Sequence, residues 1–244
     1  MYTFKEYINK KDLLKEGGNI FKLNGTPITQ RIQKADVLPT IKWLESITGL
    51  PLINNMLGST GKKSSSGDLD LAVDAETNTK DGLIHILSGW LKQNFPEDNI
   101  KDWIAKSGIS VHFKTPIKGD VQNGFVQTDF MFGEPEFMKF ALRGFGEESA
   151  YKGSDFLILM SSIAKPQGYK WSPSNGLINR ETNTVITKDP NIVSQKLLGS
   201  KATINDLNDF ESVIRYLKKY RADEYEILVA DAKETLGKQG KILP

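Results

Sequence analysis

The chain has no cysteine and only two histidines among its 244 residues. A disulfide framework, an iron–sulfur cluster and a thiol nucleophile are therefore excluded, and a zinc site is disfavoured. No stretch approaches the roughly 20 apolar residues that a membrane span needs. The charged N-terminus also lacks the apolar core of a signal peptide. These absences predict a cytoplasmic protein with no membrane partner.

An excess of charge of one sign is lacking as well, because 32 basic residues face 30 acidic ones. A net charge of +2 is compatible with a nucleic-acid partner, but any such surface has to be a local patch. Hydrophobic residues make up 39% and charged residues 25%, as in ordinary globular proteins. The length suffices for one large domain or two small ones.

The hydrophobic pattern of the first half of the chain predicts an α+β fold with one mixed sheet. Apolar residues at helical spacing indicate helices, and short runs rich in β-branched and aromatic residues indicate strands. The expected order is helix 3–16, helix 34–48, strand 51–57, loop 58–67, strand 68–74, helix 80–94, strand 109–113 and strand 125–132.

The second half of the chain is expected to be mainly helical. The expected helices cover residues 135–143, 155–165, 190–198, 206–220 and 223–236, with short strand-like pieces over 168–187. Ser154 or Asp155 is the expected cap of the second of these helices. We divide the chain into an N-terminal helical segment (1–48), a central domain (49–148) and a C-terminal domain with terminal helices (149–244).

Two carboxylates stand two residues apart in the expected strand 68–74. Alternate residues of a strand project to the same face, so Asp68 and Asp70 lie together while Leu69 and Leu71 enter the core. Neighbouring carboxylates repel each other unless a cation lies between them. Mg²⁺ prefers such hard oxygen ligands, usually together with substrate phosphates. The pair therefore predicts a metal site.

A third carboxylate is needed to complete that site, and we expect it to come from Asp129. This residue lies in a strand of high β propensity next to the apolar Phe130 and Phe132. Asp120 and Glu134 are the poorer choices, because both lie beside glycine in expected turns. Two ions held in this way can activate an attacking hydroxyl and stabilise a leaving pyrophosphate.

The loop before the acidic strand predicts a phosphate site. Gly58 lets the backbone approach a phosphate closely, and the Ser59 hydroxyl can donate to a phosphate oxygen. Lys62 and Lys63 supply compact positive charges, and Gly67 allows a second close approach. The loop is not a Walker loop, because the Gly-x4-Gly-Lys-Ser/Thr spacing is absent. A solvated polar loop is the alternative interpretation.

The order of these motifs resembles the polymerase-beta nucleotidyltransferase superfamily, and family X DNA polymerases in particular. The residues that carry the resemblance are Gly58-Ser59, the basic loop, Ser65-Ser66-Gly67-Asp68-Leu69-Asp70, Tyr151-Lys152-Gly153-Ser154-Asp155, the segment from Gly168 to Leu177 and the segment from Asp189 to Gly199. The resemblance covers roughly residues 50–200. It implies a nucleotidyltransferase palm over residues 49–148 and a small thumb-like α/β domain over residues 149–244.

The resemblance also implies an activity: transfer of a nucleoside monophosphate from an NTP or dNTP to an acceptor hydroxyl, such as a DNA or RNA 3′ end. Asp68, Asp70 and Asp129 would bind two Mg²⁺ ions, or Mn²⁺ in their place. Tyr151 and Gly153 would border the sugar. The implied nucleotide contacts are Gly58, Ser59, Lys62, Lys63, Ser66, Gly67, Tyr151, Gly153 and Asp155, the last of them near the base.

Two other functions stay open. One is a nucleotidyltransferase of the toxin–antitoxin kind that modifies tRNA or a protein, and the other is a nucleotide or nucleic-acid binder without catalysis. Ser162 stands where the family often has an arginine that reaches the templating strand. Neither histidine is expected in the site: His85 should be at least partly buried on an apolar helix face, and His112 should lie on the surface of a strand.

Overall fold

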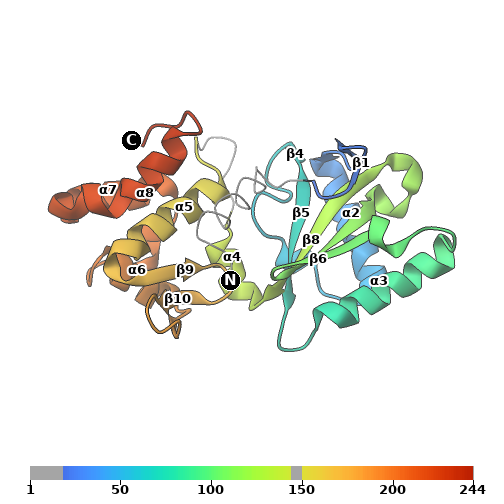
Figure 1. Cartoon of the computed structure of the whole chain (residues 1–244), viewed down its shortest axis with the longest axis horizontal. Coiled ribbons are helices and arrows are strands. Elements are labelled where there is room, and N and C mark those ends of the chain that lie inside the picture. The colour runs from blue at the N-terminus through green and yellow to red at the C-terminus, as the bar shows by residue number, and fades with distance from the viewer. Residues whose placement is uncertain (1–18, 144–149, 244) are drawn as a thin grey trace.

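The computed structural model describes residues 19–143 and 150–243. Two bodies lie side by side along the long axis of the molecule (Figure 1). We call residues 19–133 the sheet body and residues 150–243 the helical body, and α4 (Pro135–Ala141) lies between them. The expected helix 3–16 falls outside the described residues.

The sheet body is built on a four-stranded mixed sheet, which confirms the mixed sheet predicted from the sequence. The strand order is β5 (Asp68–Asp74), β8 (Phe125–Gly133), β7 (Ser110–Pro116) and β6 (Ile104–Ser107). β5 runs parallel to β8, and the other neighbouring pairs are antiparallel. Alternate residues of β5 and β8 such as Leu69, Leu71 and Phe130 are fully buried in the core of this body, as strand alternation requires.

Two helices pack against this core. α2 (Lys34–Thr48) and α3 (Lys80–Asn94) have the bounds that the hydrophobic pattern predicted. α2 ends at Gly49, whose φ of 71° lets its N–H donate to the carbonyl of Glu45. α3 begins at Thr79, whose side chain accepts the N–H of Gly82. Both helices bury apolar residues at helical spacing: Val37, Ile41 and Leu44 in α2, and Leu83, Leu87 and Leu91 in α3.

The predicted strand over 51–57 is wrong. This segment forms a 3₁₀ turn over Ile53–Asn55 instead. The side chain of Glu45 accepts the N–H groups of Leu52 (2.6 Å) and Ile53 (2.8 Å), so these two donors are not available to a sheet ladder. The remaining short strands of this body are β1 (Lys22–Leu23) with β2 (Thr26–Pro27), and β3 (Ile32–Gln33) with β4 (Ser65–Ser66).

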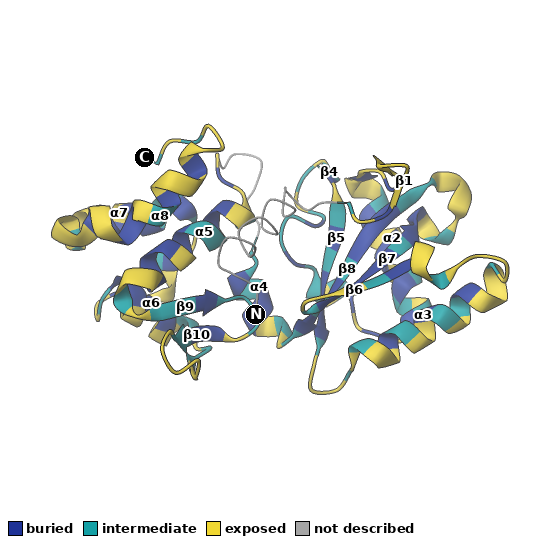
Figure 2. Cartoon of the chain, in the orientation of Figure 1, coloured by how far each residue is buried: buried dark blue, intermediate teal, exposed yellow. Residues whose placement is uncertain are grey.

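The helical body has its own buried core (Figure 2). Its helices are α5 (Gly153–Ala164), α6 (Pro190–Leu198), α7 (Phe210–Tyr220) and α8 (Tyr225–Gly237). A small antiparallel sheet joins β9 (Tyr169–Ser172), β10 (Gly176–Asn179) and β11 (Val185–Thr187). The helix expected over 206–220 is divided, because Asp209 caps α7 by accepting the N–H of Ser212.

The start of α5 also differs from the prediction. Lys152, rather than Ser154 or Asp155, is the capping position, and Asp155 is the third residue of the helix. The Asp155 carboxylate accepts the N–H of Lys152 at 2.7 Å, as in a capping box. The domain boundary expected near residue 148 falls in the range 144–149, outside the described residues, so the division into three parts stays a prediction. None of the helices described is long and apolar enough to cross a bilayer.

Candidate active site

The sheet register brings three carboxylates together. Asp70 in β5 is paired with Asp129 in β8, which is paired on its other side with His112 in β7. Asp68 lies two residues along β5, opposite Gln127. Residues paired across neighbouring strands share a face, and one carboxylate oxygen from each of the three aspartates lies within 4.8 Å of the others. The cluster therefore has two causes: Asp68 and Asp70 are two residues apart in β5, and the pairing of β5 with β8 adds Asp129.

The cluster is electrostatically strained without a cation. Burial and the charge of Asp129 raise the pKa of the Asp68 carboxyl to about 6, against the opposing effects of a backbone hydrogen bond and of the charge of Arg31. Burial, followed by the charges of Asp68 and Asp129, raises the pKa of Asp70 well above its usual value. A divalent cation among the three would offset this repulsion. An all-oxygen donor set of carboxylates fits Mg²⁺ or Mn²⁺.

The turn at Gly58 is built against the acidic pair. Gly58 has φ 57°, and a Cβ at this position would lie 3.0 Å from Oδ2 of Asp70. A larger residue would therefore be strained and would crowd the carboxylate. The backbone N–H of Gly58 donates to the carbonyl of Leu142 (2.8 Å). Thr60 fixes the other end of the turn, because its hydroxyl accepts the N–H of Asp70 at 3.0 Å.

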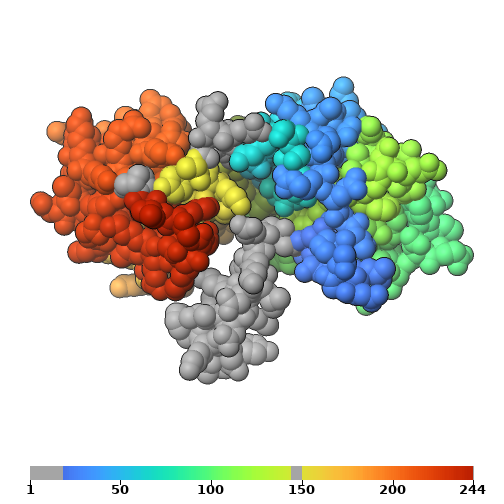
Figure 3. All heavy atoms as spheres, turned by 90° about the horizontal axis from the view of Figure 1, so that it is seen from above, coloured from blue at the N-terminus to red at the C-terminus, as the bar shows by residue number. Residues whose placement is uncertain are grey.

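A cleft of about 480 Å³ opens in front of this turn. Its walls come from the loop 58–67, from β5 and from the N-terminal end of α5. The sheet body and α5 (yellow) lie on either side of the middle of the molecule (Figure 3). The expected site residues that line it are Gly58, Ser59, Lys63, Gly67, Asp68, Asp70 and Gly153. Asp129 is not a lining residue, although its carboxylate belongs to the acidic cluster.

The remaining nucleotide contacts expected from the sequence do not line the cleft. The Lys62 residue as a whole is exposed, but its amine is partly buried. This burial, followed by the charge of Arg143, lowers the pKa of the amine. Ser66 is buried, with 3% of its surface exposed, where β4 pairs with β3. Both residues belong to the loop, but the structure does not bring their side chains to the walls of the cleft.

Tyr151 and Asp155 are held within the helical body. The Tyr151 ring stacks on Phe210 with 3.8 Å between ring centroids, and its hydroxyl donates to the carbonyl of Ile242 (2.9 Å). Asp155 is only 1% exposed and forms an ion pair with Lys241 at 2.5 Å. The structure therefore does not place Asp155 where a base could stack on it, nor the Tyr151 side chain where a sugar could lie.

Arg31 is a residue of the cleft that the sequence did not reveal. Its Nε and Nη2 donate to the hydroxyl and the carbonyl of Ser65 at 3.1 and 3.0 Å. These bonds hold the guanidinium beside Gly67, since Nη1 would lie 3.4 Å from a Cβ there. The pairing of β3 with β4 brings Arg31 to the loop. No local pattern around residue 31 signals this proximity.

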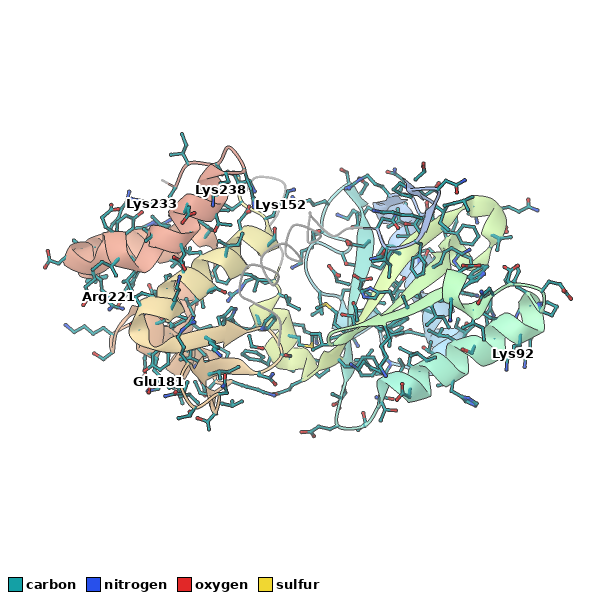
Figure 4. All side chains as sticks on the ribbon, in the orientation of Figure 1. Lys92, Lys152, Glu181, Arg221, Lys233 and Lys238 are labelled. Carbon is teal, nitrogen blue, oxygen red and sulfur yellow. The ribbon has the colours of Figure 1, made fainter. Side chains whose placement is uncertain are left out.

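A second basic residue missed from the sequence is Lys152, which lines the cleft at the start of α5. It lies at the end of the helix that faces the sheet body (Figure 4). Positive charges therefore enter the cleft from both bodies: Arg31 and Lys63 from the sheet body, and Lys152 from the helical body.

The expectations for both histidines are wrong. His85 is exposed on α3. His112 is only 8% exposed, and its Nδ1 lies 2.7 Å from Oδ1 of Asp129. Its Nε2 lies 2.7 Å from the hydroxyl of Ser107. His112 shares its face of the sheet with the acidic cluster, because the register of β7 on β8 pairs it with Asp129.

No protein-family model matches this chain, and no curated protein matches it. Among solved structures, the chain is similar to polymerase beta of Leishmania infantum, solved as a ternary P/T complex, with 15% identity and a TM-score of 0.39. The alignment covers 73% of this chain and 70% of that one. A score this low does not establish a common fold, so membership of the polymerase-beta superfamily stays a prediction.

Proposed function

We propose that the protein is a metal-dependent nucleotidyltransferase, which transfers a nucleoside monophosphate from an NTP or dNTP to an acceptor hydroxyl and releases pyrophosphate. The observation that supports this most directly is the cluster of Asp68, Asp70 and Asp129 beside the Gly58-Ser59 turn, at a cleft lined with basic residues. A metal–triphosphate complex requires acidic groups for the metal ions and basic groups for the phosphates, and this cleft would supply both.

The carboxylates of Asp68, Asp70 and Asp129 would hold two Mg²⁺ ions. Such ions polarise the attacking hydroxyl and offset the charge on the leaving phosphates. The acceptor oxygen forms a bond to the α-phosphorus while the bond to the oxygen that bridges to the β-phosphate breaks. Pyrophosphate leaves, and a carboxylate of the cluster, for which Asp129 is our choice, accepts the hydroxyl proton.

The basic side of the cleft would bind the triphosphate. Ser59 supplies a hydroxyl donor, Lys63 a compact charge and Arg31 a planar guanidinium that can form paired hydrogen bonds to phosphate oxygens. Gly153 and Ser154 bring the N-terminal end of the twelve-residue helix α5 to the same cleft. The positive end of the helix dipole adds to the attraction of an anion that already has these side-chain partners.

One observation bears on the acceptor. Ser162, at the position where the resemblance suggests an arginine that reaches a template, is buried in the helical body. Its hydroxyl donates to the carbonyl of Leu228 (2.9 Å) and accepts the N–H of Ala232 (3.1 Å). Because the buried Ser162 side chain cannot take the place of that arginine, we include acceptors that need no template: a single-stranded 3′ end, tRNA or a protein hydroxyl.

The test is an incubation with each α-labelled NTP and dNTP in Mg²⁺ or Mn²⁺. Primer–template DNA, single-stranded DNA, tRNA and a protein lysate are offered as separate acceptors. We expect the label to pass to at least one acceptor in the wild-type protein and to none with Asp70→Asn. Transfer by Asp70→Asn at the wild-type rate would refute the proposed mechanism. Metal-dependent nucleotide binding without transfer to any acceptor would favour the non-catalytic alternative.

A further inference from the structure

We infer that His112 is a positioning residue, which fixes the Asp129 carboxylate in the orientation that binds metal. This inference rests on the proposed function, because it concerns the same acidic cluster. Asp129 is the member of the cluster that comes from the inner strand β8, and its carboxylate needs a partner that fixes its orientation. The terminal torsion of an aspartate is broad, so its backbone alone does not fix where the two carboxylate oxygens point.

The hydrogen bonds around His112 define its donor and acceptor atoms. A carboxylate only accepts hydrogen bonds, so the contact of 2.7 Å to Oδ1 of Asp129 requires a proton on Nδ1. In the neutral ring Nε2 is then an acceptor, and Ser107 can donate its hydroxyl proton to it at 2.7 Å. The ring is thus held at both nitrogens, between β6 on one side and β8 on the other.

A second donor reaches the same carboxylate oxygen. The side-chain amide of Gln127 donates to Oδ1 of Asp129 at 2.9 Å, and its carbonyl oxygen accepts the N–H of Ile20 at 2.9 Å. Two donors on Oδ1 favour Oδ2 of Asp129 as the oxygen that coordinates a cation. Hydrogen bonds to a coordinating carboxylate of this kind typically contribute a factor of about 10–100 in metal affinity or activity.

Burial makes the role of His112 specific. The residue is only 8% exposed, and in the sheet register it lies directly opposite Asp129 on one side and Ala105 on the other. Water therefore has poor access to replace the lost donor if the imidazole is removed. Gln127 would be left as the donor to Oδ1. One hydrogen bond holds the Asp129 carboxylate less firmly than two, so the metal would lose a correctly placed ligand.

The experiment measures the dissociation constant of Mn²⁺ alone, by electron paramagnetic resonance of the free ion, in four variants beside the wild type. His112→Asn keeps a donor near the position of Nδ1, whereas His112→Gln carries its donor further out, near Nε2. Thr115→Val is the matched structural control, because it removes a buried hydrogen bond of 2.6 Å to Thr128 in the same two strands. Asp70→Asn reports whether the cluster binds metal at all.

We expect His112→Gln to weaken Mn²⁺ binding about 10–100-fold, and His112→Asn to remain within about 3-fold of the wild type. Thr115→Val should lower the urea midpoint without changing the Mn²⁺ dissociation constant. Wild-type affinity in folded His112→Gln, with affinity lost in Asp70→Asn, would overturn the role of His112 and leave the proposed function intact. Wild-type affinity in Asp70→Asn would refute the metal site itself, and the inference with it.

Discussion

Replacing Asp68 with asparagine should stabilise the metal-free protein at neutral pH. The charged carboxylate of Asp68 lies among buried groups and next to Asp129, and its pKa is raised from 3.8 to about 6. A shift of roughly 2 pK units corresponds to on the order of 3 kcal/mol that the folded state loses when Asp68 ionises. Asparagine has a similar shape and no charge. We therefore expect a gain of roughly 1–3 kcal/mol, the lower part of the range allowing for charge relaxation around the site.

The sign of the pH dependence follows from proton linkage. Between about pH 4 and pH 6 the folded wild type retains a proton on Asp68 that the unfolded chain has lost, so stability falls as pH rises through this window. The free energy of unfolding of Asp68→Asn does not fall in this window. The variant should therefore be no more stable than the wild type at pH 4, and its gain in stability should be complete by about pH 7.

Urea denaturation in EDTA at pH 4.5, 6 and 7.5 measures this difference. With a slope of about 2 kcal/mol per molar urea, the midpoint of Asp68→Asn at pH 7.5 should exceed that of the wild type by about 0.5–1.5 M. Saturating Mn²⁺ should offset most or all of the advantage, since a ligand at 100 times its dissociation constant stabilises the folded wild type by about 2.7 kcal/mol. A metal-free variant less stable than the wild type, or equal stabilisation of both proteins by Mn²⁺, would refute the electrostatic reasoning.

Three further predictions concern the cleft. Arg31→Lys should raise the KM for the nucleotide about 10-fold with little change in kcat, because the paired hydrogen bonds to phosphate are lost. Steady-state kinetics measures both constants, and Arg180→Lys, at an exposed position distant in sequence from the site, is the control. Gly58→Ala should weaken Mn²⁺ binding and destabilise the fold by about 1–2 kcal/mol in thermal melts, since its Cβ would meet Asp70. At subsaturating Mg²⁺, the rate of transfer should fall as pH drops below about 6, where protons compete with metal at Asp68; a pH-independent rate between 5 and 7.5 under these conditions would argue against this.

The parts of the fold that local pattern determines were predictable. α2, α3, β5 and β8 have apolar residues at spacings that identify them without any knowledge of their neighbours. β6 (Ile104–Ser107) was missed, because a four-residue strand with Lys and Ser among its members has too little pattern to stand out. The Asp68 and Asp70 pair was predictable for the same local reason, since alternation alone puts both side chains on one face.

The rest of the site depends on which segments pair, and local sequence does not encode that. His112 meets Asp129 only through the register of β7 on β8, and Arg31 meets the loop only through β3 and β4. A shift of one residue in either pairing would turn these side chains to the opposite face. The contact between Asp155 and Lys241 was not predictable for the same reason, because Lys241 lies 86 positions later in the chain.

The most direct test of the central claim is a crystal structure with Mn²⁺ and a nonhydrolysable nucleoside triphosphate, examined by anomalous scattering. We predict two Mn²⁺ peaks about 4 Å apart among Asp68, Asp70 and Asp129, with the triphosphate along Ser59 and Arg31. A nucleotide bound elsewhere, or no anomalous peak between these three carboxylates at saturating Mn²⁺, would contradict the assignment.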